Sequence, residues 1–390
     1  MMRLKNYKKF IESIGDPNDM WDYIPESIKE IHQLFKDNGK KLFVVGGSVR
    51  DFLNNERPKD FDLATDALPE EVVKIIGDRW RVTLQGKSFF VVVVYTEDEP
   101  KGMEIATFRS DDYGDLLGKT RNPNVKYSTI EEDSARRDIS WNALYYDLDK
   151  REILDLSGGM EDMKNKITRF IGDPDMRIKE DPLRILRCVR FSSRYNFRIE
   201  DKTSDSIRRN KSQLSIITKP RIWEEIHKAY KQCKDFKKYL DIITDLELWE
   251  QVFPKSIINT NVIKCGSLEV YFANLFKDES VKTLQRKLVQ TYVIPDDISR
   301  VVAFLVWFQS FLPENILEFY DKKKSYKISN DMIIEWIKVA NLTDPKYTTF
   351  TKFDRSVSSE ELMARGLFDR ELGLEIKRQE IENFRKLLNG

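Results

Sequence analysis

Hydrophobic and polar positions follow two different periods along the chain. Up to about residue 150, short apolar runs that end at turn residues predict strands, and helical spacing appears between them, as in 69–76. A mixture of strands and helices in this order indicates a head that contains a sheet. The predicted strands cover residues 42–45, 61–64, 89–95, 103–108 and 143–147.

Beyond residue 150 the strand patterns fade and amphipathic helical patterns recur. The clearest examples are 183–191, 222–230 and 374–388, with turn signals such as Gly172-Asp173-Pro174 between such segments. The pattern therefore predicts an α+β protein, with a small mixed-sheet head followed by an elongated all-helical remainder.

Composition narrows the classes of function. The chain has 66 basic and 65 acidic residues, so any RNA binding has to come from local basic surface rather than from bulk charge. Three scattered cysteines and two isolated histidines indicate neither a zinc site nor a disulfide framework. The longest apolar stretch, 301–312, is too short to cross a membrane, and the N-terminus lacks an apolar signal region. A cytoplasmic protein with no membrane partner is expected.

The first chemical motif is a glycine turn at the end of the first predicted strand. Gly46, Gly47 and Ser48 expose backbone N–H groups and lead into a helix start at about Val49, an arrangement that favours phosphate oxygens. Arg50 adds a fixed positive charge for a triphosphate. A simple turn after a strand is the alternative interpretation.

Two carboxylates follow ten residues later, at Asp60 and Asp62. Alternate side chains on a strand share a face, so both carboxylates point the same way while Phe61 packs behind them. Two oxygen ligands on one face suit Mg²⁺ when substrate phosphates complete its shell, and we predict Asp60 and Asp62 as the catalytic metal ligands. Asp-x-Asp pairs also occur on solvated strands.

These residues resemble a known family. GG-x-VRD followed by KD-x-D-x-AT-D is similar to the first motif of the class II tRNA nucleotidyltransferases and bacterial poly(A) polymerases of the polymerase β superfamily. The resemblance implies a polymerase β-like nucleotidyltransferase head, in which Gly47 and Arg50 contact the nucleotide and Asp60 and Asp62 bind magnesium.

A second motif, R-R-D followed by N-A, lies in 131–147. Asp138 is able to accept a hydrogen bond from a ribose 2′-hydroxyl, and Arg137 is able to pair with phosphate. It resembles the family's ribose-reading motif, although Ile139-Ser140-Trp141 replaces the usual F-T-I. A salt-bridged helix start is the alternative.

A third motif lies in 179–197, where a helix is predicted to begin at Pro182. Asp181, Arg184, Arg187 and Arg190 repeat every three residues and share a face. The resemblance implies that Asp181 and Arg184 form a protein template for the base of CTP or ATP, and that Arg187 and Arg190 reach phosphate or base groups. An amphipathic helix with solvated arginines is the alternative.

Further segments extend the resemblance. Glu104 lies on a predicted strand and is either a further acidic group near the metals or part of a strand-edge salt bridge. Residues 110–127 resemble a flexible family loop that is associated with the change from adding C to adding A. Basic clusters at Arg208-Arg209-Lys211, Lys237-Lys238 and Lys322–324 are candidates for tRNA backbone contact or solvated faces.

Together, these features predict a CCA-adding tRNA nucleotidyltransferase with Mg²⁺ as cofactor. Its partners would be the tRNA 3′ end, CTP and ATP, with no obligate protein partner. The expected divisions are an N-terminal helical segment (1–33), head (34–148), neck (149–215), and body and tail (216–390). A poly(A) polymerase, an A-only enzyme and an inactive RNA-binding module are the alternatives. The first usually carries a basic G-R-R-F-R-L strand, where this chain reads GKSFFVVVV at 86–94.

Overall fold

The chain forms two compact units in this computed structural model, Met1–Ile217 and Thr218–Gly390. The structure describes residues 19–58, 60–85, 90–114 and 124–389. Three predicted features therefore lie wholly or partly outside the described residues. They are most of the N-terminal segment, the tip of the loop and Phe89 of the third strand. The boundary between the units falls close to the predicted end of the neck at residue 215, and the finer division into head, neck, body and tail stays a prediction.

A seven-stranded mixed sheet forms the centre of the first unit, with strand order β3-β4-β5-β2-β1-β8-β9. β2 and β5 are parallel, whereas the other neighbours are antiparallel, which confirms the predicted mixed sheet of an α+β fold. The strands are β1 (Leu42–Val45), β2 (Asp62–Thr65), β3 (Arg81–Gln85), β4 (Val91–Tyr95), β5 (Met103–Thr107), β8 (Leu144–Asp147) and β9 (Glu152–Asp155).

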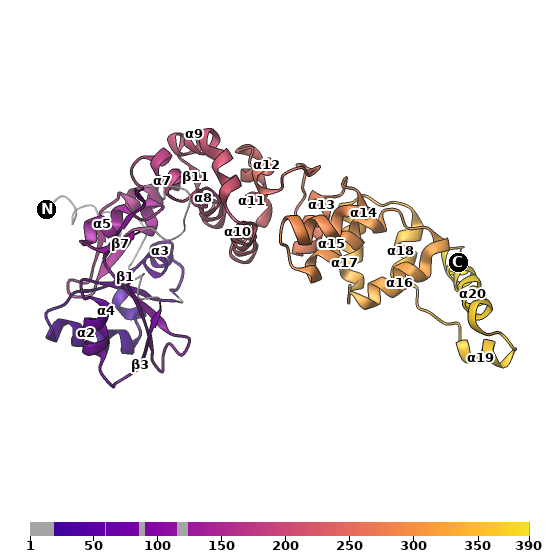
Figure 1. Cartoon of the computed structure of the whole chain (residues 1–390), viewed down its shortest axis with the longest axis horizontal. Helices are drawn as coiled ribbons and strands as arrows, with labels where there is room; N and C mark the ends of the chain where they lie inside the picture. The colour runs from indigo at the N-terminus through magenta and orange to yellow at the C-terminus, as the bar shows by residue number, and fades with distance from the viewer. Residues whose placement is uncertain (1–18, 59, 86–89, 115–123, 390) are drawn as a thin grey trace. The chain divides into compact units, whose positions relative to one another are not determined.

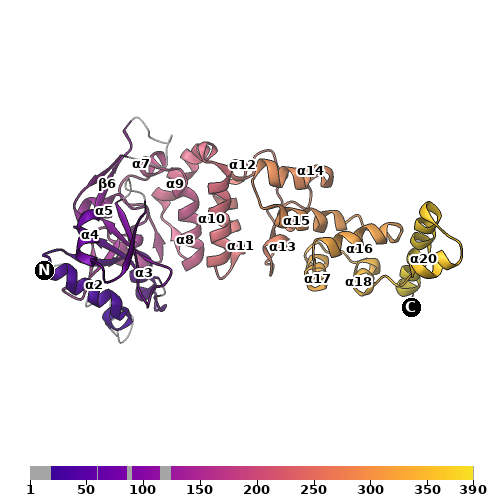
Figure 2. The same cartoon turned by 60° about the horizontal axis from the view of Figure 1, so that its bottom comes forward.

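Helices α2 and α4 pack against each other and against this sheet (Figures 1 and 2). Ile28, Ile31 and Phe35 of α2 are fully buried, so the apolar stripe of this helix faces the core. The helices of this unit are η1 (Met20–Tyr23), α2 (Glu26–Asp37), α3 (Gly47–Leu53), α4 (Pro69–Ile76), α5 (Ile130–Ala135), η3 (Ser140–Asn142), α6 (Gly159–Lys164), α7 (Pro174–Glu180), α8 (Arg184–Tyr195), α9 (Asp201–Asn210) and η4 (Lys211–Ile216).

Several strands were not predicted. β3 and β9 extend the sheet at its two edges, and β9 lies beyond the predicted end of the head. A two-stranded pair, β10 (Ile167–Thr168) and β11 (Arg198–Ile199), lies among the helices that follow. The predicted loop 110–127 is a loop only in part, because β6 (Arg109–Asp112) pairs antiparallel with β7 (Asn124–Tyr127) at its base.

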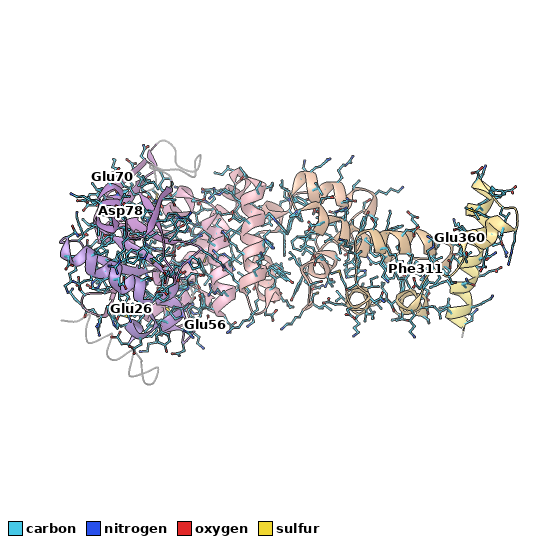
Figure 3. The ribbon with its side chains drawn as sticks, turned by 90° about the horizontal axis from the view of Figure 1, so that it is seen from below. Glu26, Glu56, Glu70, Asp78, Phe311 and Glu360 are labelled. Carbon is cyan, nitrogen blue, oxygen red and sulfur yellow. The ribbon has the colours of Figure 1, made fainter. Side chains whose placement is uncertain are left out.

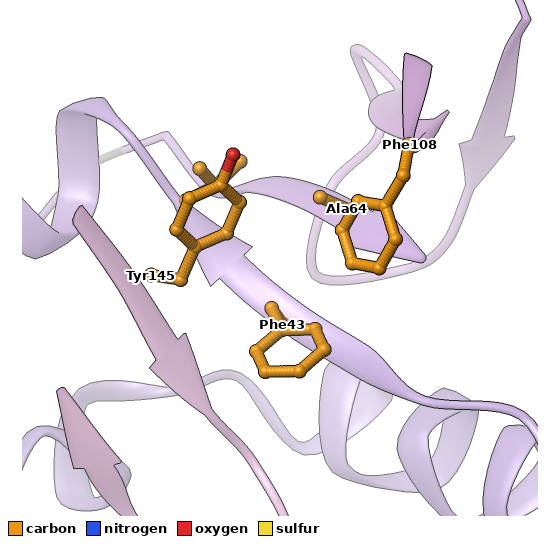
Figure 4. Close-up of a cluster of buried hydrophobic side chains, with 5 residues drawn as sticks. Phe43, Ala64, Phe108 and Tyr145 are labelled. Carbon is orange, nitrogen blue, oxygen red and sulfur yellow. The ribbon is translucent and has the colours of Figure 1, made fainter. Parts of the chain in front are cut away.

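One face of the sheet carries an aromatic cluster (Figure 4). Phe43 on β1 lies within 6.2 Å of the rings of both Phe108 and Tyr145, measured between centroids. Ala64 on β2 is part of the same cluster, and Ile130 of α5 packs against it. This face also carries the candidate site.

The second unit contains helices and no strand among its described residues, as predicted. Phe311, labelled in Figure 3, is fully buried among the rings of Phe308, Phe319 and Phe350. No described helix of the chain is long and apolar enough to cross a membrane. The helices are α10 (Lys219–Gln232), α11 (Phe236–Asp245), α12 (Trp249–Val252), α13 (Leu268–Leu275), α14 (Val281–Arg286), the π-helical η5 (Lys287–Thr291), α15 (Asp296–Phe308), η6 (Pro313–Asn315), α16 (Ile316–Ser325), α17 (Asn330–Val339), α18 (Pro345–Lys352), α19 (Ser359–Ala364) and α20 (Asp369–Asn389).

Candidate active site

The two predicted metal ligands lie at the start of β2. Asp62 is the first residue of this strand, whereas Asp60 lies in the bend before it, so only one of them is a strand residue. Phe61 is buried and both aspartates are exposed, so the predicted alternation of inward and outward side chains is present.

Glu104 of β5 lies beside Asp62. Leu63 pairs with Ile105 in the parallel β2–β5 ladder, so the residues one position earlier are neighbours on the same face. Val45 and Tyr145 continue this row across β1 and β8. The carboxylates therefore lie on the sheet face that carries the aromatic cluster.

The charges of these acidic groups act on one another. Desolvation by the surrounding protein, together with the negative charges of Glu104 and Asp60, raises the pKa of Asp62 to about 6. The positive charges of Arg137 and Arg50 oppose this shift. Repulsion among carboxylates at one position is the electrostatic setting that a bound cation relieves.

The donor chemistry of this position fits a hard divalent cation. Carboxylate oxygens are the ligands that such ions prefer, and phosphate oxygens of a substrate are able to complete the shell. Within the part of the chain that the structure describes, no group of three or more His, Cys, Asp or Glu side chains is arranged to hold a metal ion by itself.

The glycine turn joins β1 to α3. Gly46 has φ 72° and ψ −111°, a conformation that strongly favours glycine, and Gly47 is the first residue of α3. The helix begins two residues earlier than predicted. Ser48 is buried, and its hydroxyl has no hydrogen-bond partner among the described residues.

Arg50 is buried rather than extended into solvent. Its Nε donates to the hydroxyl of Tyr195 at 2.7 Å, and its Nη1 donates to Oδ1 of Asn142 at 2.6 Å. Three rings lie within 5.7 Å of its guanidinium carbon, those of Trp141, Phe191 and Tyr195. This arginine is therefore held in one orientation by groups from several elements.

Arg137 lies over the Tyr145 ring, 5.2 Å from its centroid, on the carboxylate-bearing face. Its guanidinium donates to Asp133, which also accepts from the Tyr145 hydroxyl at 2.5 Å. Burial alone would raise the pKa of Asp133, but Arg137 and Arg136 outweigh burial and lower it to about 2. The network fixes a positive charge close to Asp62.

Asp138 and Arg187 form an ion pair between the second and third motifs. Nε of Arg187 donates to Oδ2 of Asp138 at 2.7 Å, and Nδ2 of Asn142 donates to Oδ1 at 3.1 Å. Burial opposes ionisation of Asp138, but Arg187 and the Asn142 amide hold its pKa well below the ordinary range. The carboxylate is ionised and its orientation is fixed.

The third motif begins differently from the prediction. Asp181 has an extended backbone and ends α7, while α8 starts at Arg184, so the two residues do not share one helix. The reason is Pro182, because the residue before a proline is disfavoured in the helical region. Asp181 instead accepts from the backbone N–H of Leu183 through its side chain.

The arginines of α8 have separate partners. Arg184 is buried and bonds to Glu180 and to the backbone oxygen of Arg136, which joins it to the second motif. Arg190 is buried, with its guanidinium 4.1 Å from the centroid of the Phe191 ring. Arg187 is bonded to Asp138.

The sequence interpretation missed several polar residues at this site. Asp51 accepts from the Tyr195 hydroxyl at 2.6 Å and pairs with Arg194 at 3.3 Å. Asn142 bonds both Arg50 and Asp138. Asp51, Asn142 and Tyr195 all lie inside the motif segments, which was the available signal.

The predicted basic clusters have partners on the chain itself. Arg209 pairs with Asp175, Lys237 with Asp241, and Lys322 lies 4.3 Å from the centroid of the Trp307 ring. Their contact with tRNA stays a prediction.

Known proteins match both the sequence and the fold. The poly(A) polymerase head domain matches residues 42–169, and the probable RNA and SrmB-binding site of polymerase A matches residues 196–256. The CCA-adding enzyme of Lactobacillus helveticus is 30% identical over 360 residues, which cover 89% of this chain and 82% of that protein. The chain belongs to the family of CCA-adding enzymes and poly(A) polymerases.

Within this family, poly(A) polymerase I of Salmonella typhi is 34% identical over 242 residues, or 60% of this chain. The chain spans about half the length of the poly(A) polymerases it matches. The crystal structure of the Bacillus stearothermophilus CCA-adding enzyme in complex with CTP has the same fold, with a TM-score of 0.67, 22% identity and 94% coverage of both chains.

Proposed function

We propose that this protein adds C, C and A to the 3′ end of tRNA from CTP and ATP, without a nucleic-acid template and with release of pyrophosphate. The observation that carries the proposal is the share of this chain that is similar to each kind of relative. Similarity to the CCA-adding enzyme of L. helveticus covers 89% of this chain, whereas similarity to the poly(A) polymerase of S. typhi covers 60%. The likeness to the CCA-adding enzyme therefore extends over most of the second unit, which supports CCA addition.

Asp60 and Asp62 would hold Mg²⁺, with Glu104 beside them. A bound magnesium ion would lower the pKa of the RNA 3′-hydroxyl and neutralise charge on the leaving pyrophosphate. The closeness of Glu104 to Asp62 on one sheet face supports its assignment as a further acidic group at the metals. The alternative of a strand-edge salt bridge has no support among the described contacts of Glu104.

The nucleotide would lie against the glycine turn. The backbone of Gly46 and Gly47 and the charge of Arg137 would receive its phosphates. The ionised, oriented carboxylate of Asp138 would accept the ribose 2′-hydroxyl. Asp181 and Arg184 would match the Watson–Crick edge of the base, with Arg187 and Arg190 supporting the same region.

The strand after residue 86 favours CCA addition over polyadenylation. Residues 91–94 are four valines of β4, of which the last three are buried and Val91 is half-buried. The basic strand that poly(A) polymerases usually carry would have arginines at positions 87, 88 and 90, where this chain has Lys87, Ser88 and Phe90. The candidate carboxylates are all present, which argues against an inactive RNA-binding module.

The test uses three tRNA transcripts that end at the discriminator base, at C and at CC. Each is incubated with Mg²⁺ and CTP, ATP or both, and products are resolved at single-nucleotide length. We expect completion to CCA from every start and then a stop. Addition of A to the CC transcript alone would indicate an A-only enzyme, and long A tails on unstructured RNA would indicate a poly(A) polymerase.

A further inference from the structure

Tyr195 is the last residue of α8, and its hydroxyl bonds to two charged residues of α3, Arg50 and Asp51. Its hydroxyl accepts from Nε of Arg50 at 2.7 Å and donates to Oδ1 of Asp51 at 2.6 Å. A neutral phenol is able to do both at once. Tyr195 therefore links the glycine-turn helix to the helix of the third motif.

Arg50 has little freedom under these constraints. Nε is bound by Tyr195 and Nη1 by Asn142, and the faces of the guanidinium lie among aromatic rings. Its Nη2 lies 3.6 Å from the point where a Cβ on Gly47 would stand. The third nitrogen thus faces the start of α3, where the backbone N–H groups of the turn begin.

The guanidinium of Arg50 therefore lies at the glycine turn, with Nη2 on the side of Gly47. A rigid planar cation in such a place presents one fixed N–H edge to an anion.

We propose that Tyr195 is a positioning residue, which turns the Nη2 edge of Arg50 toward the glycine turn so that it meets the triphosphate of the incoming nucleotide. This inference rests on the proposed function, because it assumes that a nucleoside triphosphate binds at the turn. It adds that phosphate binding depends on a hydroxyl of α8. The effect is the same for CTP and ATP, because the triphosphate is common to both.

The test compares Tyr195→Phe with wild type in equilibrium binding of CTP and ATP without RNA. The substitution keeps the ring that packs on Trp141 and removes only the hydroxyl. We expect the Kd of both nucleotides to rise about tenfold, the effect of weakening one charge-assisted hydrogen bond. In turnover with tRNA, KM should rise by the same factor while kcat changes less than twofold.

Tyr292→Phe is the matched control. Its hydroxyl bonds to Ser256 at 2.6 Å and to the Pro254 carbonyl at 2.8 Å in the second unit, remote from the candidate site in sequence and in another unit. This variant loses comparable contacts, so a general loss of stability would appear in both variants. Only Tyr195→Phe should change nucleotide affinity.

A double-mutant cycle with Arg50→Lys gives the decisive outcome. Because Tyr195 acts through Arg50, its removal should change nucleotide affinity less than twofold once the guanidinium is gone. Unchanged affinity in Tyr195→Phe, or additive effects in the double variant, would overturn the inference.

A protein that binds nucleotide through Tyr195 but extends no tRNA contradicts the proposed function alone. A Tyr195→Phe protein that extends tRNA with an unchanged KM for CTP and ATP contradicts this inference alone.

Discussion

Arg187 on α8 donates its Nε–H to the buried carboxylate of Asp138 at 2.7 Å, across 49 positions of sequence. The pair joins the motif expected to read the ribose to the motif expected to read the base. The Asp138 carboxylate is nearly inaccessible, whereas about a third of the Arg187 side chain is exposed. Loss of the arginine would therefore leave a buried charge without its cation.

The first prediction concerns this pair. Arg187→Ala should lower the free energy of unfolding by about 2 kcal/mol, because the Asp138 carboxylate stays desolvated without its charge-assisted bond. Urea denaturation measures the change. Arg198→Ala is the control, because its partner Asp201 is exposed and such pairs contribute less than about 1 kcal/mol. Equal effects of the two substitutions would contradict the role given to the buried pair.

The second prediction concerns acid stability. The folded-state pKa of Asp133 is about 2, below its ordinary value of 3.8, so the unfolded chain binds more protons between these values. The stabilisation of about 2 kcal/mol is complete above pH 4 and is lost as the pH falls from 4 through 2.

Denaturation curves at several pH values between 5 and 2 measure this contribution. Wild type should lose stability over the window more steeply than Asp133→Asn, which has no carboxylate to titrate. Parallel pH dependence of the two proteins would show that Asp133 is not held ionised by Arg136 and Arg137.

The third prediction concerns the carboxylates at the sheet face. Without metal, Asp62→Asn should leave the free energy of unfolding unchanged or raise it by less than about 1 kcal/mol. The reason is that the substitution removes repulsion from Glu104 and Asp60. Mg²⁺ should raise the melting temperature of wild type but not that of the variant. Stabilisation of both by Mg²⁺ would place the ion elsewhere.

The fourth prediction concerns Gly46. Its φ of 72° and ψ of −111° are strained for a residue with a side chain, so Gly46→Ala should cost about 1–3 kcal/mol. Gly373→Ala is the control, because Gly373 lies inside α20 with open space around it, and alanine there should stabilise the protein by about 0.5–1 kcal/mol. Thermal denaturation should show a lower melting temperature for Gly46→Ala and a higher one for Gly373→Ala. A lower melting temperature for both variants would contradict the role given to the Gly46 backbone conformation.

Local patterns predicted much of the fold. The apolar run at 42–45 is β1, and the helical spacing at 69–76 matches α4 residue for residue. β3 was missed because it is an edge strand, with Arg81, Thr83 and Leu84 exposed, so it lacks the apolar run of a buried strand.

The site was predicted less completely. Asp62, Arg137 and Asp138 were predicted as site residues because each lies in a short segment with a distinctive chemical pattern. The surroundings of Arg50 were out of reach, because Trp141, Phe191 and Tyr195 come from segments far along the chain. These rings enclose the Arg50 side chain, and only tertiary packing determines that.

CCA addition is the central claim, and the mass of the product tests it most directly. A tRNA transcript that ends at the discriminator base is incubated with the protein, Mg²⁺, CTP and ATP. The mass of the intact RNA is then measured by mass spectrometry. We predict a single product heavier by two C residues and one A residue, and no product with Asp60→Asn or Asp62→Asn. A ladder of A additions, or an unchanged mass with wild type, would contradict the account.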